Sequence, residues 1–383
     1  MKIQKMKWGA TTFMVGVLLS IHLPIYAQGQ DGTIKGNVVT ADAAVSVEIT
    51  NESRGITKIA TIDSRGGFRS DGLPPGKYSV KLVKAGQIIS ERSVNLGIGG
   101  TSQVTLSKSQ SSIEEITVMG TTTEVIDSGL AEIGLVMTSE ELTVLPVARN
   151  LTAVTLLAPG VSRGDTDFAG SSFGGSSNAE NTMFINGLNT VNFRNGLGFS
   201  QVPFEFFETI QIKTGGYSAK YGRSTGGVQN IRSKSGGNEF EFGANMYHGS
   251  DLSTKPDTYV AQNSQDKNTE RSYSVSASGP IIKDRVFFYG LYNNERPSSD
   301  YAGVRSGRYY YEKTEGRFWA GKLDAYITDN HRVELTAFSD ERDLVETGWE
   351  YDADTKVRGD LVGYEFDRRG GDNWILSYTG DLT

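Results

Sequence analysis

The sequence predicts a mainly β protein built from three consecutive parts: a small β-sandwich, an α+β region, and the first strands of an incomplete transmembrane antiparallel β-barrel. Short runs with two-residue hydrophobic alternation, separated by glycine and proline turns, precede residue 110. Longer alternating runs start at Glu239, and the connections between them are alternately long and short, as in outer-membrane barrels. Between these regions the chain is rich in glycine and has two short helical patterns.

Residues 1–27 indicate an export signal that is removed from the mature protein. Three lysines precede an apolar run over residues 13–21, and Ala27 is the expected cleavage point. An uncleaved membrane anchor is the alternative. It needs about 20 uninterrupted apolar residues, and polar residues together with Pro24 prevent such a run here.

The charge balance and the lack of cysteine exclude several classes of function. The net charge of −7 becomes −10 once the three lysines of the signal are removed, and no basic stripe is present to neutralise phosphates. Nucleic acid is therefore not an expected partner. Without cysteine, the chain has neither disulfides nor thiolate metal sites.

Residues 28–110 predict the β-sandwich. Residues 32–39 and 45–49 alternate with period two, and the turn at residues 72–76 leads into another alternating strand. The segment resembles the carboxypeptidase regulatory-like domain, a transthyretin-like module with a carbohydrate-binding-like fold. Its only aromatic residues are Phe68 and Tyr78, which form no platform for a sugar. A periplasmic spacer is therefore favoured over a glycan-binding or partner-binding module.

The stretch from Val202 to Gly237 contains the most informative motifs. Glu208 to Lys213 predicts a strand, and Gly-Gly pairs follow at residues 215–216 and 226–227, where the backbone takes positive φ or approaches another strand closely. The stretch resembles the end of the plug domain of TonB-dependent outer-membrane receptors, and within that family the Oar-like subgroup. The motifs that carry this resemblance are Val202-Pro203, Glu208 to Ile212, Tyr221-Gly222, Gly226-Gly227-Val228, Asn230 and Lys234-Ser235-Gly236. Lys220 and Arg232 depart from the family pattern, in which an acid and an apolar residue are commoner.

The resemblance implies a domain plan and a set of functional residues. The TonB box and plug domain are expected at residues 111–236, and the N-terminal part of the barrel at residues 237–383. The expected structural residues of the plug are Asn186, Gly187, Tyr221, Gly222, Gly226, Gly227 and Asn230. Plug loops of the family help to hold the ligand, and the candidate ligand contacts are Asn189, Asn192, Phe193, Arg194 and Phe199.

The family's TonB box pairs as an added strand with the energy-transducing protein TonB, and it is expected at Glu115, Ile116, Thr117 and Val118. Such pairing depends on main-chain hydrogen bonds, so the side chains need only permit an extended backbone. The last three residues are strand formers. The alternative is that this run is the first strand of the plug.

Local signals predict three further features of the plug. Thr138-Ser139-Glu140-Glu141 has the pattern of a capping box, and Asn150 is a candidate N-cap for a helix over residues 151–157. Asn186-Gly187 predicts a hairpin turn between residues 183–185 and 188–189.

The region from Glu239 onward predicts the barrel wall. Lys322 and Asp324, and likewise Arg332 and Glu334, alternate with apolar residues that face the other way. The long connections, expected as external loops, are residues 249–271, 293–316 and 340–373. About six strand-like runs are present, whereas plugged outer-membrane transporters close with about 22 strands. We therefore expect the N-terminal part of a longer receptor.

No motif for catalysis is present in the sequence. GxSxG, P-loop and HExxH patterns are absent, and neither His248 nor His331 has the spacing of a metal ligand. Asp165-Thr166-Asp167 and Asp352-Ala353-Asp354 offer oxygens for Ca²⁺ but match no EF-hand. We expect no enzyme and no cofactor.

The leading hypothesis is a TonB-dependent receptor in the outer membrane of a Gram-negative-type bacterium, with its regulatory-like domain in the periplasm. Its expected partners are TonB, outer-membrane lipid and an external small-molecule, glycan or peptide ligand; siderophore, oligosaccharide and peptide classes are not distinguished. The alternative is a non-transporting adhesin or carbohydrate-binding surface protein. A hydrolase is a weaker third hypothesis, because the nucleophile and metal constellations are missing.

Overall fold

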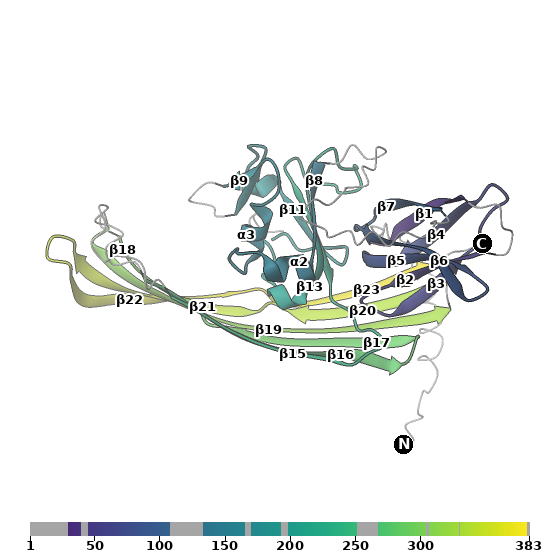
Figure 1. Ribbon diagram of the computed structural model, residues 1–383. Coiled ribbons are helices and arrows are strands. Elements are labelled where there is room, and N and C mark those ends of the chain that lie inside the picture. Colours follow the sequence, from purple (N-terminus) through teal and green to yellow (C-terminus); the bar gives the residue numbers. More distant parts are fainter. Residues whose placement is uncertain are drawn as a thin grey trace, which may run out of the picture.

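The computed structural model describes residues 30–39, 45–107, 133–164, 170–192, 198–250, 267–303, 306–328 and 330–380. Several predicted features lie outside the described residues: the export signal with Ala27, the TonB box at residues 115–118, residues 165–167, and Phe193 and Arg194. Three β units follow one another along the described chain, and each is built on its own sheet or pair of sheets (Figure 1).

The first unit, the sandwich (residues 30–107), has two sheets with strand orders β4-β1-β7 and β3-β2-β5-β6. Alternate side chains from both sheets meet in a core that includes Ile34, Ile49 and Val80. This packing confirms the β-sandwich predicted from two-residue alternation. Its strands are β1 (Gly32–Val39), β2 (Ser46–Asn51), β3 (Ile56–Ala60), β4 (Gly67–Leu73), β5 (Gly76–Lys84), β6 (Gln87–Leu96) and β7 (Thr101–Ser107).

The second unit, the plug region (residues 133–236), centres on a five-stranded sheet with the order β12-β11-β14-β13-β8. β13 contains the strand predicted from Glu208 to Lys213, and its Ile210 and Ile212 are buried. The strands are β8 (Ile133–Thr138), β9 (Val161–Arg163), β10 (Ser171–Phe173), β11 (Thr182–Ile185), β12 (Leu188–Asn189), β13 (Phe207–Gly215) and β14 (Val228–Ser233). The helices are α2 (Ser139–Val144), α3 (Leu151–Thr155) and the 3₁₀ turns η1 (Asn178–Glu180) and η2 (Phe204–Phe206).

The local predictions for the plug region are confirmed. The Thr138 N–H donates to the Glu141 carboxylate at 2.8 Å, and the Thr138 hydroxyl accepts from the Glu141 N–H, which completes the capping box of α2. Asn150 Oδ1 accepts from the Ala153 N–H at 2.9 Å at the start of α3. Asn186 and Gly187 take positive φ in the hairpin between β11 and β12. No described helix combines the length and the apolar character needed to cross a membrane.

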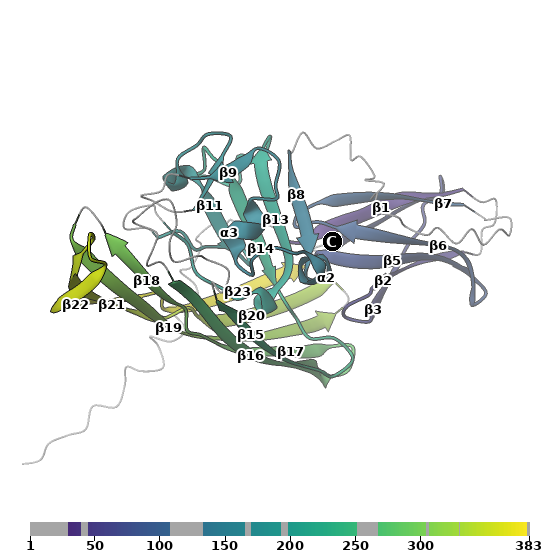
Figure 2. The ribbon, with the colours of Figure 1, turned by 60° about the vertical axis from the view of Figure 1, so that its left-hand side comes forward.

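The third unit, the wall, is a nine-stranded antiparallel sheet that curves along one side of the plug region (Figures 1 and 2). The sandwich lies beside the end of the wall at which β19 meets β20 (Figure 1). The strands are β15 (Glu241–Ser250), β16 (Lys267–Ile282), β17 (Val286–Glu295), β18 (Ser298–Gly303), β19 (Arg308–Thr328), β20 (His331–Ser339), β21 (Arg342–Asp352), β22 (Val357–Arg369) and β23 (Asp372–Gly380).

One face of the wall exposes large apolar side chains, whereas charged and polar side chains are buried on the other face. Phe242, Met246 and Leu376 are 80%, 83% and 74% exposed on the outer face. The alternating positions that face the plug region carry buried polar residues, among them Asp324 and Glu334, together with buried aromatic residues such as Phe318 and Phe338. An apolar outer band with a polar interior is the pattern of a transmembrane barrel wall.

The long connections expected as external loops at residues 293–316 and 340–373 are not irregular, because they contain paired strands. Residues 308–316 of β19 pair with β21 in an antiparallel ladder, and β21 pairs in turn with β22. These segments contain strand formers such as Tyr309, Tyr311 and Val345, so the hydrogen-bonded ladder continues beyond the alternating core of the wall.

Candidate functional site

The plug region contacts the wall at an aromatic seam formed by Phe206, Phe318 and Phe338. Phe206 lies in η2, directly after the Val202-Pro203 motif. Its ring centroid is 5.4 Å from that of Phe318 and 5.6 Å from that of Phe338, and the two wall rings stack at 6.1 Å. All three side chains are buried. Such pairs each add about 0.5–1.5 kcal/mol beyond the burial of their area.

A charge cluster of Arg232, Lys322, Asp324, Arg332 and Glu334 forms a second contact. Asp324 and Glu334 lie directly opposite each other on β19 and β20, where like charges repel. Lys322 Nζ is 3.6 Å from Asp324 Oδ1 and 3.7 Å from Glu334 Oε1. Arg232 of plug strand β14 forms an ion pair with Glu334. The plug region therefore contributes one of the cations that compensate two buried acids of the wall.

The position of Arg232 accounts for its departure from the family pattern. Its side chain is 1% exposed and reaches a carboxylate 102 residues later in the chain. An apolar residue at this position would leave Glu334 with fewer cations in a buried site, and an uncompensated buried charge is strongly unfavourable. The sequence places Arg332 and Glu334 on one side of a strand, but it does not show that Arg232 meets them.

Asn186 hydrogen-bonds the hairpin of the plug region to β14 and to wall strand β20. Its Nδ2 donates to Ser233 Oγ at 2.7 Å and to Thr336 Oγ1 of the wall at 3.1 Å, and its Oδ1 accepts from the Ser233 N–H at 3.0 Å. The residue therefore serves both the turn and the contact with β20.

Taken together, these contacts place a folded α+β domain against the mixed polar and aromatic face of a sheet whose other face is apolar. A profile of the TonB-dependent receptor plug domain matches residues 134–228, and a profile of the carboxypeptidase regulatory-like domain matches residues 33–108. The chain therefore contains a plug domain of the TonB-dependent receptor type, preceded by a carboxypeptidase regulatory-like domain.

Two curated relatives are similar to this chain over much of its length. The TonB-dependent transporter Oar of Myxococcus xanthus is 27% identical over 355 residues, which covers 80% of this chain and 33% of Oar. The probable TonB-dependent siderophore receptor PirA of Acinetobacter baumannii is 24% identical over 277 residues, which covers 64% of this chain and 35% of PirA. The chain thus spans about a third of the length of these relatives.

Solved structures of receptors also resemble this one. The crystal structure of PirA from Acinetobacter baumannii has 21% sequence identity and a TM-score of 0.47, over 65% of this chain and 38% of PirA. A structure of the ferric enterobactin receptor PfeA from Pseudomonas aeruginosa has 15% identity and a TM-score of 0.46, over 65% of this chain and 39% of PfeA.

Gly226, Gly227 and Tyr221 of the expected plug motifs lie in the packed interior, whereas Gly222 is exposed. A Cβ atom at Gly227 would lie 2.0 Å from the Phe173 ring, and one at Gly226 would lie 2.3 Å from Asn181 Oδ1. Tyr221 is buried against Phe184. A Cβ at Gly222 would meet open space, so packing does not explain that glycine.

Asn230 is the motif residue with the least expected surroundings. Its side chain is buried, and neither of its polar atoms has a hydrogen-bond partner among the described residues. Buried amides are normally bonded, and the structure gives no account of this one.

The described candidate ligand contacts are engaged within the plug region. Asn189 Oδ1 accepts from the Val191 N–H at 3.0 Å, which closes a local turn. The Asn192 N–H donates to the Gly198 carbonyl at 3.1 Å, and Phe199 packs against the core of the plug region. A role for these residues in holding a ligand stays a prediction.

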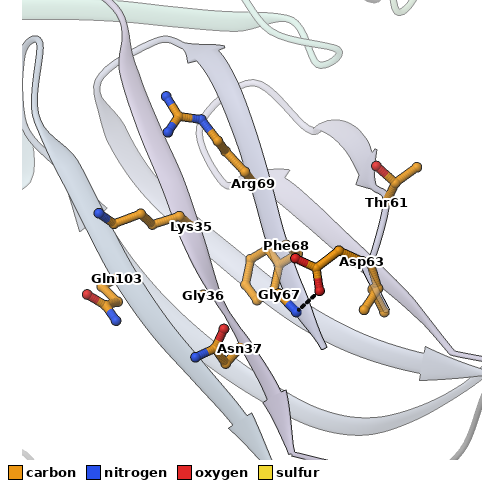
Figure 3. Close-up of a pocket in the computed structure, with 10 residues that line it drawn as sticks. Lys35, Gly36, Asn37, Thr61, Asp63, Gly67, Phe68, Arg69 and Gln103 are labelled. Atoms are coloured by element: carbon orange, nitrogen blue, oxygen red, sulfur yellow. Dashed lines mark hydrogen bonds between the residues drawn. The ribbon is translucent and has the colours of Figure 1, made fainter. Parts of the chain in front are cut away.

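A cavity of about 480 Å³ lies on the sheet of the sandwich that contains β1, β4 and β7 (Figure 3). Its charged groups are largely satisfied from within the sandwich. Asp63 Oδ1 accepts from the N–H groups of Arg65 and Gly67, each at 2.8 Å, which lowers the pKa of Asp63. Arg69 pairs with Asp71 at 2.7 Å. This arrangement gives no sign of a built ligand site.

The described residues contain no group of three or more His, Cys, Asp and Glu placed to hold a metal ion. His331 Nδ1 lies 2.6 Å from the Tyr378 hydroxyl. Asp352 Oδ1 accepts from the N–H groups of Asp354 and Thr355. His331 and Asp352 are therefore both used in local structure.

Proposed function

We propose that this receptor takes up an external ligand across the outer membrane, with the plug region as the movable stopper and TonB as the source of work. The observation that carries the proposal is the seating of the plug region on the wall. Its aromatic seam and charge cluster close off the concave face of a sheet whose outer face is apolar. A stopper of this kind blocks diffusion, so uptake requires that its contacts be broken and remade.

The charge cluster is the contact at which separation is easiest to drive. When two buried charged partners separate into water, hydration offsets much of the lost attraction. Exposing the aromatic surface of the seam to water instead costs about 25 cal/mol of free energy per Å². A pull on the plug region is therefore expected to open the charge cluster before the aromatic seam.

We place the outer membrane around the apolar band of the wall, and the sandwich on its periplasmic side. The turns of residues 282–286 and 328–331 are short, as periplasmic turns of outer-membrane barrels are. The sandwich contacts the wall beside the second of these turns.

The test of the proposal is binding of the purified receptor to the purified periplasmic domain of TonB. In the predicted TonB box, Val118→Pro removes a backbone donor that strand pairing needs, and we expect at least a tenfold loss of affinity. Val118→Ala keeps the donor and is the matched control. Equal binding by the two variants would place the box elsewhere, and no binding by the unaltered receptor would contradict the proposal.

Ligand identity is a separate question, for which the relatives suggest a first probe. PirA is named as a probable siderophore receptor, and one PfeA structure contains enterobactin. Uptake of radiolabelled iron as ferric enterobactin, with and without a proton uncoupler, tests this class directly. Retention at the surface that is indifferent to the uncoupler and to TonB would favour the non-transporting alternative.

A further inference from the structure

The sandwich inserts one arginine between the plug region and the wall. Arg54 lies in the turn between β2 and β3, where the Gly55 N–H donates to the Asn51 carbonyl at 2.9 Å and the Arg54 N–H donates to Asn51 Oδ1 at 3.0 Å. Gly55 adopts a φ of +64°, which suits glycine. This turn holds the Arg54 side chain outside the sandwich, yet that side chain is only 1% exposed.

The Arg54 guanidinium bonds to both neighbouring units. Its Nη2 donates to Glu208 Oε2 at 3.2 Å and to Ser235 Oγ at 2.8 Å, and its Nη1 donates to the Tyr326 hydroxyl of the wall at 3.3 Å. Burial alone would lower the pKa of Arg54, but Glu208 and other acids hold it above its usual value. The charged form is therefore retained in this enclosed site.

Ser235 joins Arg54 to the charge cluster. The Ser235 hydroxyl also accepts from Lys322 Nζ at 2.7 Å, and Lys322 is a member of that cluster. One hydroxyl of the plug region thus accepts from a cation of the sandwich and from a cation of the wall. Displacing Arg54 would alter the surroundings of Lys322 and, through Glu334, those of Arg232.

Asp31 makes a second connection on the same side of the sandwich. Its carboxylate accepts from Arg332 Nη2 and, at 2.6 Å, from the Thr379 hydroxyl. Arg332 in turn lies 3.5 Å from Glu334. The sandwich therefore contributes one cation and one anion to a network that already contains the plug–wall ion pairs.

Backbone contacts fix the turn in place. The Asn238 N–H donates to the Arg54 carbonyl at 3.1 Å, and Asn238 Nδ2 donates to the Gly55 carbonyl at 3.2 Å and to Asp284 Oδ1 at 2.7 Å. Asn238 lies between the plug region and β15, so the sandwich is bound at the junction of the other two units. A free periplasmic spacer does not account for these contacts.

We propose that the regulatory-like domain is a clasp that holds the plug in its seat, with Arg54 as the residue that ties the domain to plug and wall together. Release of the domain then precedes movement of the plug. The docking itself does not depend on transport; only the order of release rests on the function proposed above.

The first test is a disulfide trap in the full chain in outer-membrane vesicles. A Cβ at Gly55 would lie 3.6 Å from Asn238 Cβ, within the range that disulfides require, and the chain has no native cysteine. The double variant Gly55→Cys and Asn238→Cys is expected to cross-link almost completely on mild oxidation. Cross-linking of only a small fraction would overturn the docked arrangement.

The role of Arg54 is tested by adding Arg54→Gln to the double cysteine variant. We expect this substitution to reduce the rate of cross-linking several-fold. Arg69→Gln is the matched control, because Arg69 lies in the same domain but pairs with Asp71 at the surface. An unchanged rate in the Arg54 variant, or an equal fall in both variants, would refute the role of Arg54.

Hydrogen exchange then tests whether the docked sandwich also stabilises the plug. In the Arg54→Gln variant without cysteines, we expect amide exchange in β13 and β14 of the plug to accelerate several-fold, while β16 and β17 of the wall keep their rates. Acceleration confined to the sandwich would show a docked domain that does not hold the plug, and would overturn the proposal. Neither experiment needs TonB or a ligand, so failure of the transport proposal would leave these results unchanged.

Discussion

The aromatic seam and the charge cluster lie four residues apart along the same two wall strands, yet they stabilise the plug in different ways. Phe318 and Lys322 share β19, and Phe338 and Glu334 share β20, so the two contacts are about 13 Å apart by strand rise. The seam gains free energy from apolar burial, at about 1.5–3 kcal/mol for each fully buried large side chain. The cluster gains little net free energy, because desolvation of its charges opposes their attraction.

This difference shows what each contact contributes to the binding of the plug to the wall. The seam sets how firmly the plug is held. The cluster determines the position in which the plug is held, because each buried charge is stable only where an opposite charge lies next to it. The seam tolerates small shifts among apolar neighbours, whereas a shift at the cluster leaves Asp324 and Glu334 facing each other with fewer cations.

The largest expected effect comes from truncating the seam. Phe206→Ala removes a ring that contacts both wall phenylalanines and leaves a cavity, so we expect the plug to lose about 3–5 kcal/mol of stability. Hydrogen exchange of β13 in the receptor in detergent measures this loss. Val144→Ala is the control, because Val144 is 81% exposed. A loss below about 1 kcal/mol for Phe206→Ala would contradict the importance of the seam.

A somewhat smaller effect is expected at the cluster, with a distinctive rescue. Glu334→Gln leaves Arg232, Lys322 and Arg332 with one fewer anion, and breaking a buried ion pair from one side costs about 3 kcal/mol or more. The double variant Arg232→Met and Glu334→Gln is expected to recover much of this loss, because one buried cation is removed with the anion. Exchange of β14 amides is the measurement.

Rescue is the decisive outcome for the comparison. If the double variant is less stable than Glu334→Gln alone, Arg232 contributes more than charge compensation, and the cluster resembles the seam. Glu91→Gln is the control, because Glu91 is half exposed in its pair with Lys81 and pairs at the surface contribute about 0–1 kcal/mol.

The elements that the sequence predicted correctly are those decided by neighbours in the chain. Two-residue alternation identified the sandwich and the wall, and the capping box and the Asn-Gly turn are formed by residues within a few positions of one another. Alternation also placed Lys322 and Glu334 on the side of their strands opposite the apolar residues.

The contacts between units could not be predicted in the same way. The Arg232–Glu334 pair spans 102 residues, and the Arg54–Tyr326 bond spans 272. No local pattern distinguishes Arg54 from an ordinary turn arginine such as Arg65, which lies in an exposed turn. The one available signal was Arg232, a charge where the family commonly has an apolar residue, and it indicated a buried partner without naming it.

The smallest predicted effect calibrates the other two. Asn150→Ala removes the side-chain acceptor at the start of α3, which is expected to lower the stability of the plug by about 1 kcal/mol. Thr152→Ala is the matched control and should have little effect, because Thr152 lies two residues later and is exposed on the same helix. Because Asn150 belongs to neither contact, its loss should accelerate exchange in α3 and leave the difference between Phe206→Ala and Glu334→Gln unchanged. If Asn150→Ala instead accelerates exchange in β13 and β14 as strongly as either of those variants, the plug responds as one cooperative body. The seam and the cluster would then have no separate roles to distinguish.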